Sequence, residues 1–225
     1  MQGCGAVDGP LSVLQPAGPG AASIATVWWA MFWGGMALLG FMTALGLLAV
    51  LRRRDGAALA ADAPVRRRLW LVGGGLVLPT VVLTALLAWG ISAGHALLAL
   101  PLAEPPFTVE VTARQWQWDV HYPAQQGRGA QAGPVNRIDI PAGVPVDVRV
   151  ATADVIHSFW VPRLGGKIDA IPGRVNTLRL QADAPGVYRG LCAEYCGTGH
   201  AHMPLEVHAH PAADLARVLA DRAAP

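Results

Sequence analysis

The segment Cys192-Ala-Glu-Tyr-Cys-Gly-Thr-Gly-His-Ala-His-Met203 gathers metal-binding side chains within a short loop. Cys192 and Cys196 lie four residues apart, His200 follows four residues later, and Met203 comes three after that. Thiolate, imidazole and thioether groups are the donors that copper prefers. The two glycines between these residues allow the backbone to turn tightly. The spacing therefore predicts a loop that folds around a single metal site.

A further histidine, His157, lies upstream in Asp154-Val-Ile-His-Ser-Phe-Trp160. One thiolate with two imidazoles and a weak thioether would suit a single copper ion, whereas two thiolates are enough to bridge two ions. A disulfide between the two cysteines is the alternative in an oxidising compartment, but it would give His200 and Met203 no reason to lie where they do. His202 competes with His200 as a ligand, and the spacing favours His200.

Two long uncharged runs precede this region, in a chain that is 53% hydrophobic and 14% charged. They are Ile24–Leu51 and a run from Leu69 to about Leu100. About twenty apolar residues span a bilayer as a helix, and the three tryptophans near the start of the first run suit the headgroup region. A buried hairpin in a soluble protein is the alternative, but the runs are too long and too uniformly apolar. Pro79 should kink the second helix rather than end it.

The arginines of the first hundred residues all lie in Arg52–Arg54 and Arg66–Arg68, between the two runs. Because positive charge stays on the cytoplasmic side, we expect this connector to be cytoplasmic and both termini to lie outside. We expect residues 1–23 to be irregular, and lipidation of Cys4 stays open because no apolar region precedes it. The later residues carry nearly balanced charge, so no nucleic-acid-binding face is expected.

The remaining chain, residues 104–225, has the composition of short strands and turns. Alternating or β-branched runs predict strands at 107–112, 137–140, 144–150, 175–180 and 203–207, separated by Gly- and Pro-containing turns. Strands at this spacing favour an antiparallel sandwich, and residues 212–222 predict a short terminal helix. The chain thus divides into an N-terminal segment (1–23), a transmembrane hairpin (24–100) and a β domain (104–225).

These motifs resemble subunit II of the haem-copper cytochrome c oxidases. The resemblance rests on Asp154–Pro172, Cys192–Pro204, Gln115–Trp118 and the two spans before them. It implies a two-helix transmembrane hairpin plus an all-β, cupredoxin-like Greek-key barrel that carries a dinuclear copper A centre. It also places the chain in a bacterial inner membrane, with the copper domain on the periplasmic side.

The resemblance implies a ligand for every position of the copper motif. Cys192 and Cys196 match the bridging thiolates, His157 and Met203 match the other ligands of one copper, and His200 and the Glu194 carbonyl match those of the second. The Glu194 side chain matches a magnesium ligand at the boundary with subunit I. Haem and a further copper, copper B, would belong to subunit I alone.

Trp116 matches the aromatic residue at which electrons from cytochrome c enter the family's copper centre. The alternative is that Trp116 and Trp118 are both core residues, since strand alternation would place them on one face. Asp154 matches an acidic residue near the docking face, where carboxylates steer a basic donor. The nearly balanced charge of the β domain predicts weaker steering here. The start of the second span, Arg68–Gly75, lacks the acid that many family members place at a proton path.

The implied function is acceptance of electrons from cytochrome c and their transfer to haem in subunit I, where oxygen is reduced to water. The implied partners are subunits I and III, cytochrome c and membrane lipid, with no nucleic acid. The main alternative is a membrane-tethered module that binds or delivers copper. A quinol oxidase subunit would lack the copper ligands, and the two-span hairpin argues against a nitrous oxide reductase.

Overall fold

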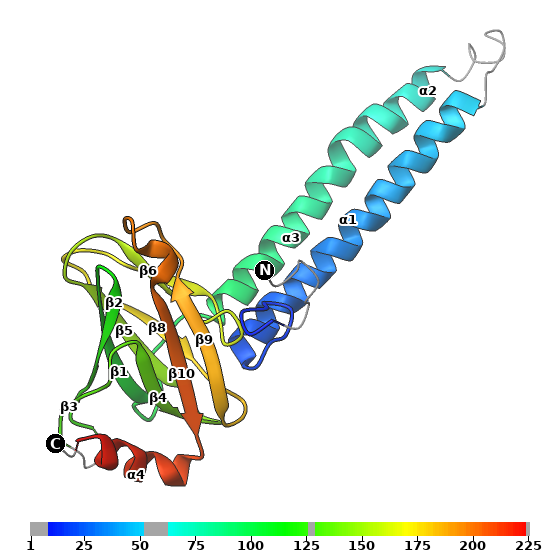
Figure 1. Ribbon diagram of the computed structural model, residues 1–225. Helices are drawn as coiled ribbons and strands as arrows, with labels where there is room; N and C mark the ends of the chain where they lie inside the picture. Colours follow the sequence, from blue (N-terminus) through cyan, green and yellow to red (C-terminus); the bar gives the residue numbers. More distant parts are fainter. Residues whose placement is uncertain (1–8, 52–62, 126–128, 224–225) are drawn as a thin grey trace. The chain divides into compact units, whose positions relative to one another are not determined.

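The computed structural model describes residues 9–51, 63–125 and 129–223, so Cys4 and Arg52–Arg54 lie outside the described residues (Figure 1). Its contacts divide the chain into two units. One unit is helical and comprises Thr26–Ala96. The other combines Met1–Ala25 with Leu97–Pro225 and contains the β domain.

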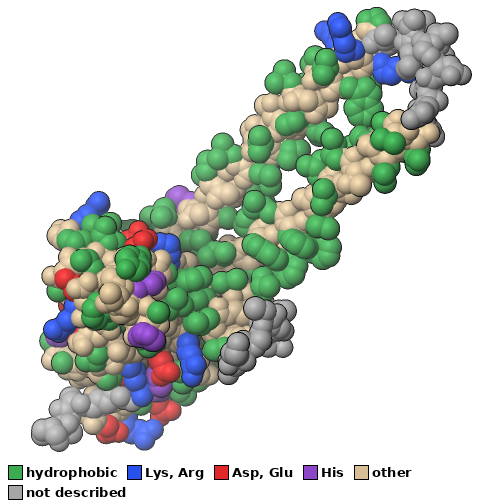
Figure 2. Space-filling model, turned by 45° about the horizontal axis from the view of Figure 1, so that its top comes forward, with side chains coloured by type: hydrophobic (Ala, Val, Ile, Leu, Met, Phe, Trp, Pro, Cys, Tyr) green, Lys and Arg blue, Asp and Glu red, His purple; other side chains and the backbone are tan. Residues whose placement is uncertain are grey.

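The helical unit consists of α1 (Pro19–Leu51, which begins in the other unit) and a second helical run made of α2 (Ala63–Arg68), η2 (Leu69–Val77) and α3 (Leu78–His95). Two stretches, Pro19–Leu51 and Pro64–His95, are long and apolar enough to cross a membrane. Figure 2 shows hydrophobic side chains along both helices, and many of them are exposed. Exposed hydrophobic side chains are expected on a helix that is surrounded by lipid.

The second span stays helical through its glycines and Pro79. Residues 69–77, which contain the three consecutive glycines, form π-helical turns, and α3 follows directly. Pro79 lies in the first turn of α3, which continues from η2 without a break, since Val77 and Leu78 both have helical backbone angles. The expectation that Pro79 does not end the helix is therefore confirmed.

The β domain contains two five-stranded sheets within the described residues. One sheet has the order β3-β2-β1-β5-β8 and the other β4-β10-β9-β6-β7. The strands are β1 (Phe107–Arg114), β2 (Gln117–Tyr122), β3 (Gln131–Ala132), β4 (Arg137–Pro141), β5 (Val146–Thr152), β6 (His157–Trp160), β7 (Lys167–Ala170), β8 (Asn176–Leu180), β9 (Gly186–Cys192) and β10 (Pro204–His210).

Strand direction differs from the predicted antiparallel arrangement in two places. The pairs β1–β5 and β10–β4 are parallel, whereas the other pairs are antiparallel. Period-2 alternation reports which face of a strand is buried and not which way its neighbour runs, so the prediction was wrong for these pairs. The overall class, two apolar helices and an all-β domain, is confirmed.

The inward faces of the two sheets form one apolar core. Its largest fully buried side chains include Trp118, Phe159, Ile138 and Ile140. The predicted terminal helix is α4 (Ala212–Ala223), which adds the buried Leu215 and Leu219 to this core.

The N-terminal segment is part of the β-domain unit rather than irregular throughout, because α1 already begins at Pro19. The backbone N–H of Ala17 donates to the Arg163 carbonyl at 2.7 Å, and its carbonyl accepts from Asp183 at 2.9 Å. Gly18 lies so close to the Gln181 carbonyl that a side chain there would overlap it. This strand-like pairing anchors the chain just before the first span.

Candidate metal centre

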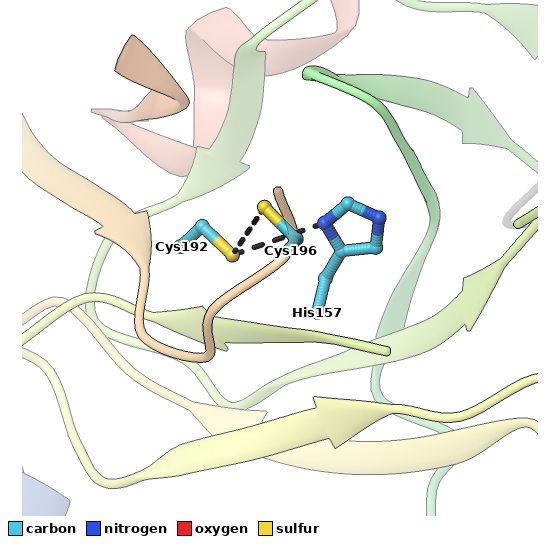
Figure 3. Close-up of side chains that lie close together, drawn as sticks. All are labelled: His157, Cys192 and Cys196. Carbon is cyan, nitrogen blue, oxygen red and sulfur yellow. Dashed lines mark hydrogen bonds between the residues drawn. The ribbon is translucent and has the colours of Figure 1, made fainter. Parts of the chain in front are cut away.

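The two cysteines face each other across the loop between β9 and β10. Cys192 ends β9, and its backbone N–H donates to the Met203 carbonyl at 3.1 Å, which closes the base of the loop. The Sγ atoms of Cys192 and Cys196 lie 3.8 Å apart, and both thiols are free and buried (Figure 3). The two cysteines therefore do not form the disulfide that was the alternative to a metal site.

His157 approaches the cysteines from a neighbouring strand. It begins β6, which pairs with β9 so that Phe159 lies opposite Cys192. The imidazole is fully buried, and its Nδ1 lies 3.8 Å from Cys192 Sγ. The side chains of His157, Cys192 and Cys196 lie close together (Figure 3), and their donor atoms are all within 4.8 Å of one another.

The remaining predicted donors lie around the same two sulfurs. The Nδ1 atom of His200 is 3.7 Å from Cys196 Sγ, and Met203 Sδ is 3.9 Å from it. The carbonyl oxygen of Glu194 is 3.2 Å from Cys192 Sγ. His202, the competing histidine, is exposed. The fold therefore brings together all six residues that the sequence singled out, and it favours His200 over His202.

Asp154 holds the His157 ring in place. Its Oδ1 lies 2.9 Å from His157 Nε2, and its Oδ2 accepts the backbone N–H of Gln115 at 2.7 Å. Partial burial alone would raise the pKa of Asp154, but the hydrogen bonds from His157, Gln115 and Val155 outweigh it and lower that pKa to about 2. A carboxylate bound to Nε2 leaves Nδ1 directed at the cysteines, and carboxylates commonly orient metal-binding histidines in this way. From the sequence, Asp154 was expected only near a docking face.

The donor set fits a soft or borderline metal. Two sulfur atoms of cysteine, two imidazole nitrogens, a thioether and one carbonyl lie together, and four of the residues that supply them are buried: His157, Cys192, Cys196 and Met203. This chemistry suits copper. Burial raises the pKa of the Cys196 thiol to about 11, with further contributions from Cys192 and Asp154. Without a metal the Cys196 thiol stays protonated, so metal binding must displace its proton.

Trp116 lies directly on the cysteine loop. Its Nε1 donates to the Cys196 carbonyl at 3.2 Å, and Gln115 Nε2 donates to the same oxygen at 2.9 Å. The indole packs so closely on Gly199 that any side chain there would overlap it. Gly197 adopts φ +113°, which residues with a side chain rarely do. The sequence predicted that these glycines allow a tight turn, whereas their close contact with Trp116 follows only from the fold.

The two tryptophans of the Gln115–Trp118 segment have different surroundings. Trp116 precedes β2 and is 38% exposed, whereas Trp118 is fully buried. Trp118 packs edge-on against Phe159, with ring centroids 5.8 Å apart, and against His157 at 6.1 Å. Strand alternation does not place them on one face, because β2 begins only at Gln117. The core interpretation holds for Trp118 alone.

The four histidines that were not considered as ligands lie outside this cluster. His208 lies 3.0 Å from Glu206, and His210 lies 2.7 Å from the buried Asp139. His95 ends α3 and His121 is exposed on β2. Their expected structural or surface roles agree with these positions.

Fold and site together define a class of protein: a β domain with a buried group of thiols and imidazole that could hold a metal ion, joined to two helices long and apolar enough to cross a membrane. A family model described as cytochrome c oxidase subunit II, periplasmic domain, matches residues 125–210. The cytochrome c oxidase subunit 2 of Branchiostoma floridae is 33% identical over 168 residues, which cover 67% of this chain and 69% of that protein. The chain therefore belongs to the cytochrome c oxidase subunit II family.

Two further relatives show how far the similarity extends. The cytochrome c oxidase subunit 2 of Alkalihalophilus pseudofirmus is 45% identical over 99 residues, which cover 44% of this chain but only 28% of that longer protein. The periplasmic domain of subunit II of cytochrome oxidase of Bradyrhizobium japonicum is 31% identical, with a TM-score of 0.47, and the match covers 54% of this chain and 96% of that domain.

Proposed function

We propose that this chain is the electron-accepting subunit of a haem-copper cytochrome c oxidase. It receives electrons from cytochrome c and passes them to haem in subunit I, where oxygen is reduced to water. The observation that carries this proposal is the pair of buried thiols 3.8 Å apart, encircled by two imidazoles, a thioether and a carbonyl. Family membership supports the same function.

The proposed ligands would hold two copper ions: the thiolates of Cys192 and Cys196 would serve both, His157 and Met203 would serve one, and His200 with the Glu194 carbonyl would serve the other. When bound, this pair of coppers supplies a one-electron carrier with little change of geometry between its redox states. The chain's contribution is a fixed and dry set of donors, since His157, Met203 and both cysteines are buried.

The burial of the donors argues against the alternative of a copper-delivery module. A delivery protein must release its metal, and an open and exchangeable site serves that purpose. Here Asp154 fixes one imidazole, and Trp116 and Gln115 both bind the backbone of the cysteine loop. Hydrogen bonds that hold the ligands and their loop in this way make a centre rigid, as expected of a permanent electron carrier.

We propose Trp116 as the residue through which electrons enter. It is the only residue of the described Gln115–Trp118 segment that combines a surface-exposed ring with a hydrogen bond to a cysteine of the cluster. Its indole thus offers an apolar contact to a donor and a direct link to the loop that carries Cys196.

The remaining assignments concern the assembly. We propose that the chain lies in a bacterial inner membrane with subunits I and III, with the β domain in the periplasm and the arginine-rich connector, including Arg66–Arg68, in the cytoplasm. The Glu194 side chain is about half exposed, with Oε2 4.0 Å from Lys167 Nζ. We propose that it binds magnesium at the boundary with subunit I, while its carbonyl serves copper.

The test uses the full chain in detergent, loaded with copper. We expect two coppers per chain and an electron paramagnetic resonance spectrum in which one unpaired electron is shared equally by two copper nuclei. Cys196→Ser should abolish that spectrum. A single copper with a localised spectrum, or copper that a mild chelator removes quickly, would contradict the proposal and favour the binding module.

A second test addresses Trp116. Trp116→Ala should keep the copper content and spectrum but slow reduction by cytochrome c, and Trp116→Phe should restore part of the rate. Equal reduction rates in all three proteins would remove the proposed role.

A further inference from the structure

Two histidines outside the metal centre lie two residues apart on β10. Burial alternates along the stretch Glu206-Val-His-Ala-His210, and Val207 and Ala209 are buried in the core. The side chains of Glu206, His208 and His210 therefore lie together on the outer face of the strand. The two histidines are about 7 Å apart along the strand, and from this spacing two imidazoles can reach one metal ion.

Two carboxylates lie beside these imidazoles. Glu206 Oε2 is 3.0 Å from His208 Nε2, and Asp139 Oδ1 is 2.7 Å from His210 Nε2. Asp139 lies on β4, directly opposite His208 in the parallel pair of β10 and β4. Its side chain is fully buried, whereas the two imidazoles are 17% and 20% exposed. Two imidazoles and two carboxylates thus lie together, and we call them the β10 group.

Each carboxylate of the β10 group is also paired with an arginine. Arg137 Nη2 lies 2.8 Å from Asp139 Oδ1, and Arg189 Nε lies 3.8 Å from Glu206 Oε1. Because these charges are compensated, an ion attracted by charge alone gains little here, and coordination by the imidazole nitrogens must hold it. Zn²⁺ and similar borderline ions bind imidazole and carboxylate together, whereas Mg²⁺ and Ca²⁺ prefer oxygen ligands alone.

We propose that His208, His210 and Asp139 form a second metal site, which takes Zn²⁺ or a similar borderline divalent ion. The His210 ring stays beside Asp139, and the His208 ring turns from Glu206 toward Asp139, its neighbour on β4. Zinc bonds of about 2.0–2.2 Å set a nitrogen and an oxygen ligand about 3.4 Å apart in a tetrahedral site. The 2.7 Å contact between His210 and Asp139 therefore has to open by about 0.7 Å. Glu206, which already contacts His208, supplies the fourth ligand.

The test uses the copper-loaded full chain in detergent with excess Mg²⁺, so that the copper ligands and the proposed magnesium site are already occupied. Equilibrium dialysis against Zn²⁺, followed by metal analysis, should find one zinc ion per chain in addition to the copper. X-ray absorption at the zinc edge should show two imidazole nitrogens together with carboxylate oxygen at about 2.0–2.2 Å. The electron paramagnetic resonance spectrum of the copper should not change.

Glutamine substitutions identify the ligands. His208→Gln and His210→Gln should each weaken zinc binding at least about tenfold, because the loss of groups that merely orient metal ligands already costs that much. The amide introduced by His210→Gln can still donate to Asp139, so the fold is retained. The matched control is His121→Gln, at an exposed histidine on β2 of the other sheet, which should bind zinc like the unaltered chain. Zinc should also raise the urea midpoint of the unaltered chain but not of the two variants, because it joins β4 to β10 in the folded state alone.

Three results would overturn the second metal site. One is a zinc affinity in His208→Gln and His210→Gln equal to that of His121→Gln. Another is a zinc shell of oxygen atoms alone, or one that contains sulfur, which would place the ion on surface carboxylates or on the cysteines. The third is displacement of the zinc by Ca²⁺, because carboxylates rather than imidazoles would then hold it. None of these measurements requires electron transfer, so they test the second site independently of the proposed function.

Discussion

Gly199→Ala tests how the Trp116 indole is seated on the cysteine loop. A Cβ at position 199 would lie 2.6 Å from Cγ and 2.7 Å from Cε3 of the indole and would overlap Cδ2. Carbon atoms in ordinary contact are about 3.5–4.0 Å apart, so ring and loop must separate by about 1 Å. Gly199 itself has φ −89° and ψ 4°, a conformation open to alanine. The effect is therefore a matter of space and not of backbone strain.

The side that gives way should be Trp116. Its ring is 38% exposed and can turn outward, whereas Cys196 and Met203 are held in the core. A displaced ring loses its 3.2 Å hydrogen bond to the Cys196 carbonyl. Overpacking of this kind costs about 1–3 kcal/mol. We therefore expect that loss in the free energy of unfolding, retained copper, and reduction by cytochrome c slowed to the level of Trp116→Ala.

Three measurements on the full chain check this: urea unfolding, copper content with its spectrum, and the rate of reduction by stopped flow. Gly129→Ala is the control, because a Cβ there meets no atom within 4 Å. If Gly199→Ala matches this control in both stability and reduction rate, then the indole does not rest on the loop as described. If copper is lost as well, the loop has moved rather than the ring.

Three other substitutions test contacts that hold His157, the N-terminal segment and the β domain in place. Asp154→Ala removes the acceptor of the His157 imidazole and should weaken copper binding by about 10- to 100-fold in chelator competition; unchanged affinity would deny its orienting role. Gly18→Ala places a Cβ against the Gln181 carbonyl and should lower stability to urea by about 1–3 kcal/mol, so full stability would show that the N-terminal segment is not held there. Arg179→Met leaves Asp147 without its two hydrogen bonds of 2.7 and 2.9 Å. Because both side chains are mostly buried, unfolding should become easier by about 2–3 kcal/mol, and Asp147→Asn added to it should recover part of the loss; no recovery would contradict the pairing.

The ligand loop was predictable because its geometry is local. Cys192 and Met203 bound a short connection between two adjacent antiparallel strands, and one backbone hydrogen bond closes it. A loop closed in this way keeps its side chains near one another, so residue types and spacing predicted a cluster of donors within it. The helices were predictable for a similar reason, since an uncharged run of this length can satisfy its backbone in lipid only as a helix.

The role of Asp154 and the contact of Trp116 were not predictable in this way. Trp116 meets a loop about eighty residues further along the chain, and Asp154 meets Gln115 across thirty-nine. The spacing of hydrophobic and polar residues along the chain does not indicate contacts between residues so far apart in sequence. The cue in the sequence was the glycine at 199, but a glycine in a loop signals a turn as readily as a close neighbour.

The sequence by itself determined the membrane anchor, the all-β character of the later chain and the chemistry of the metal donors, because these follow from composition, local spacing and residue type. Only the tertiary structure decided which strands run parallel, that His200 and not His202 faces the cysteines, and that Trp116 alone of its pair reaches the surface. Those features depend on contacts between residues distant in sequence, and such contacts exist only once the two sheets have packed together.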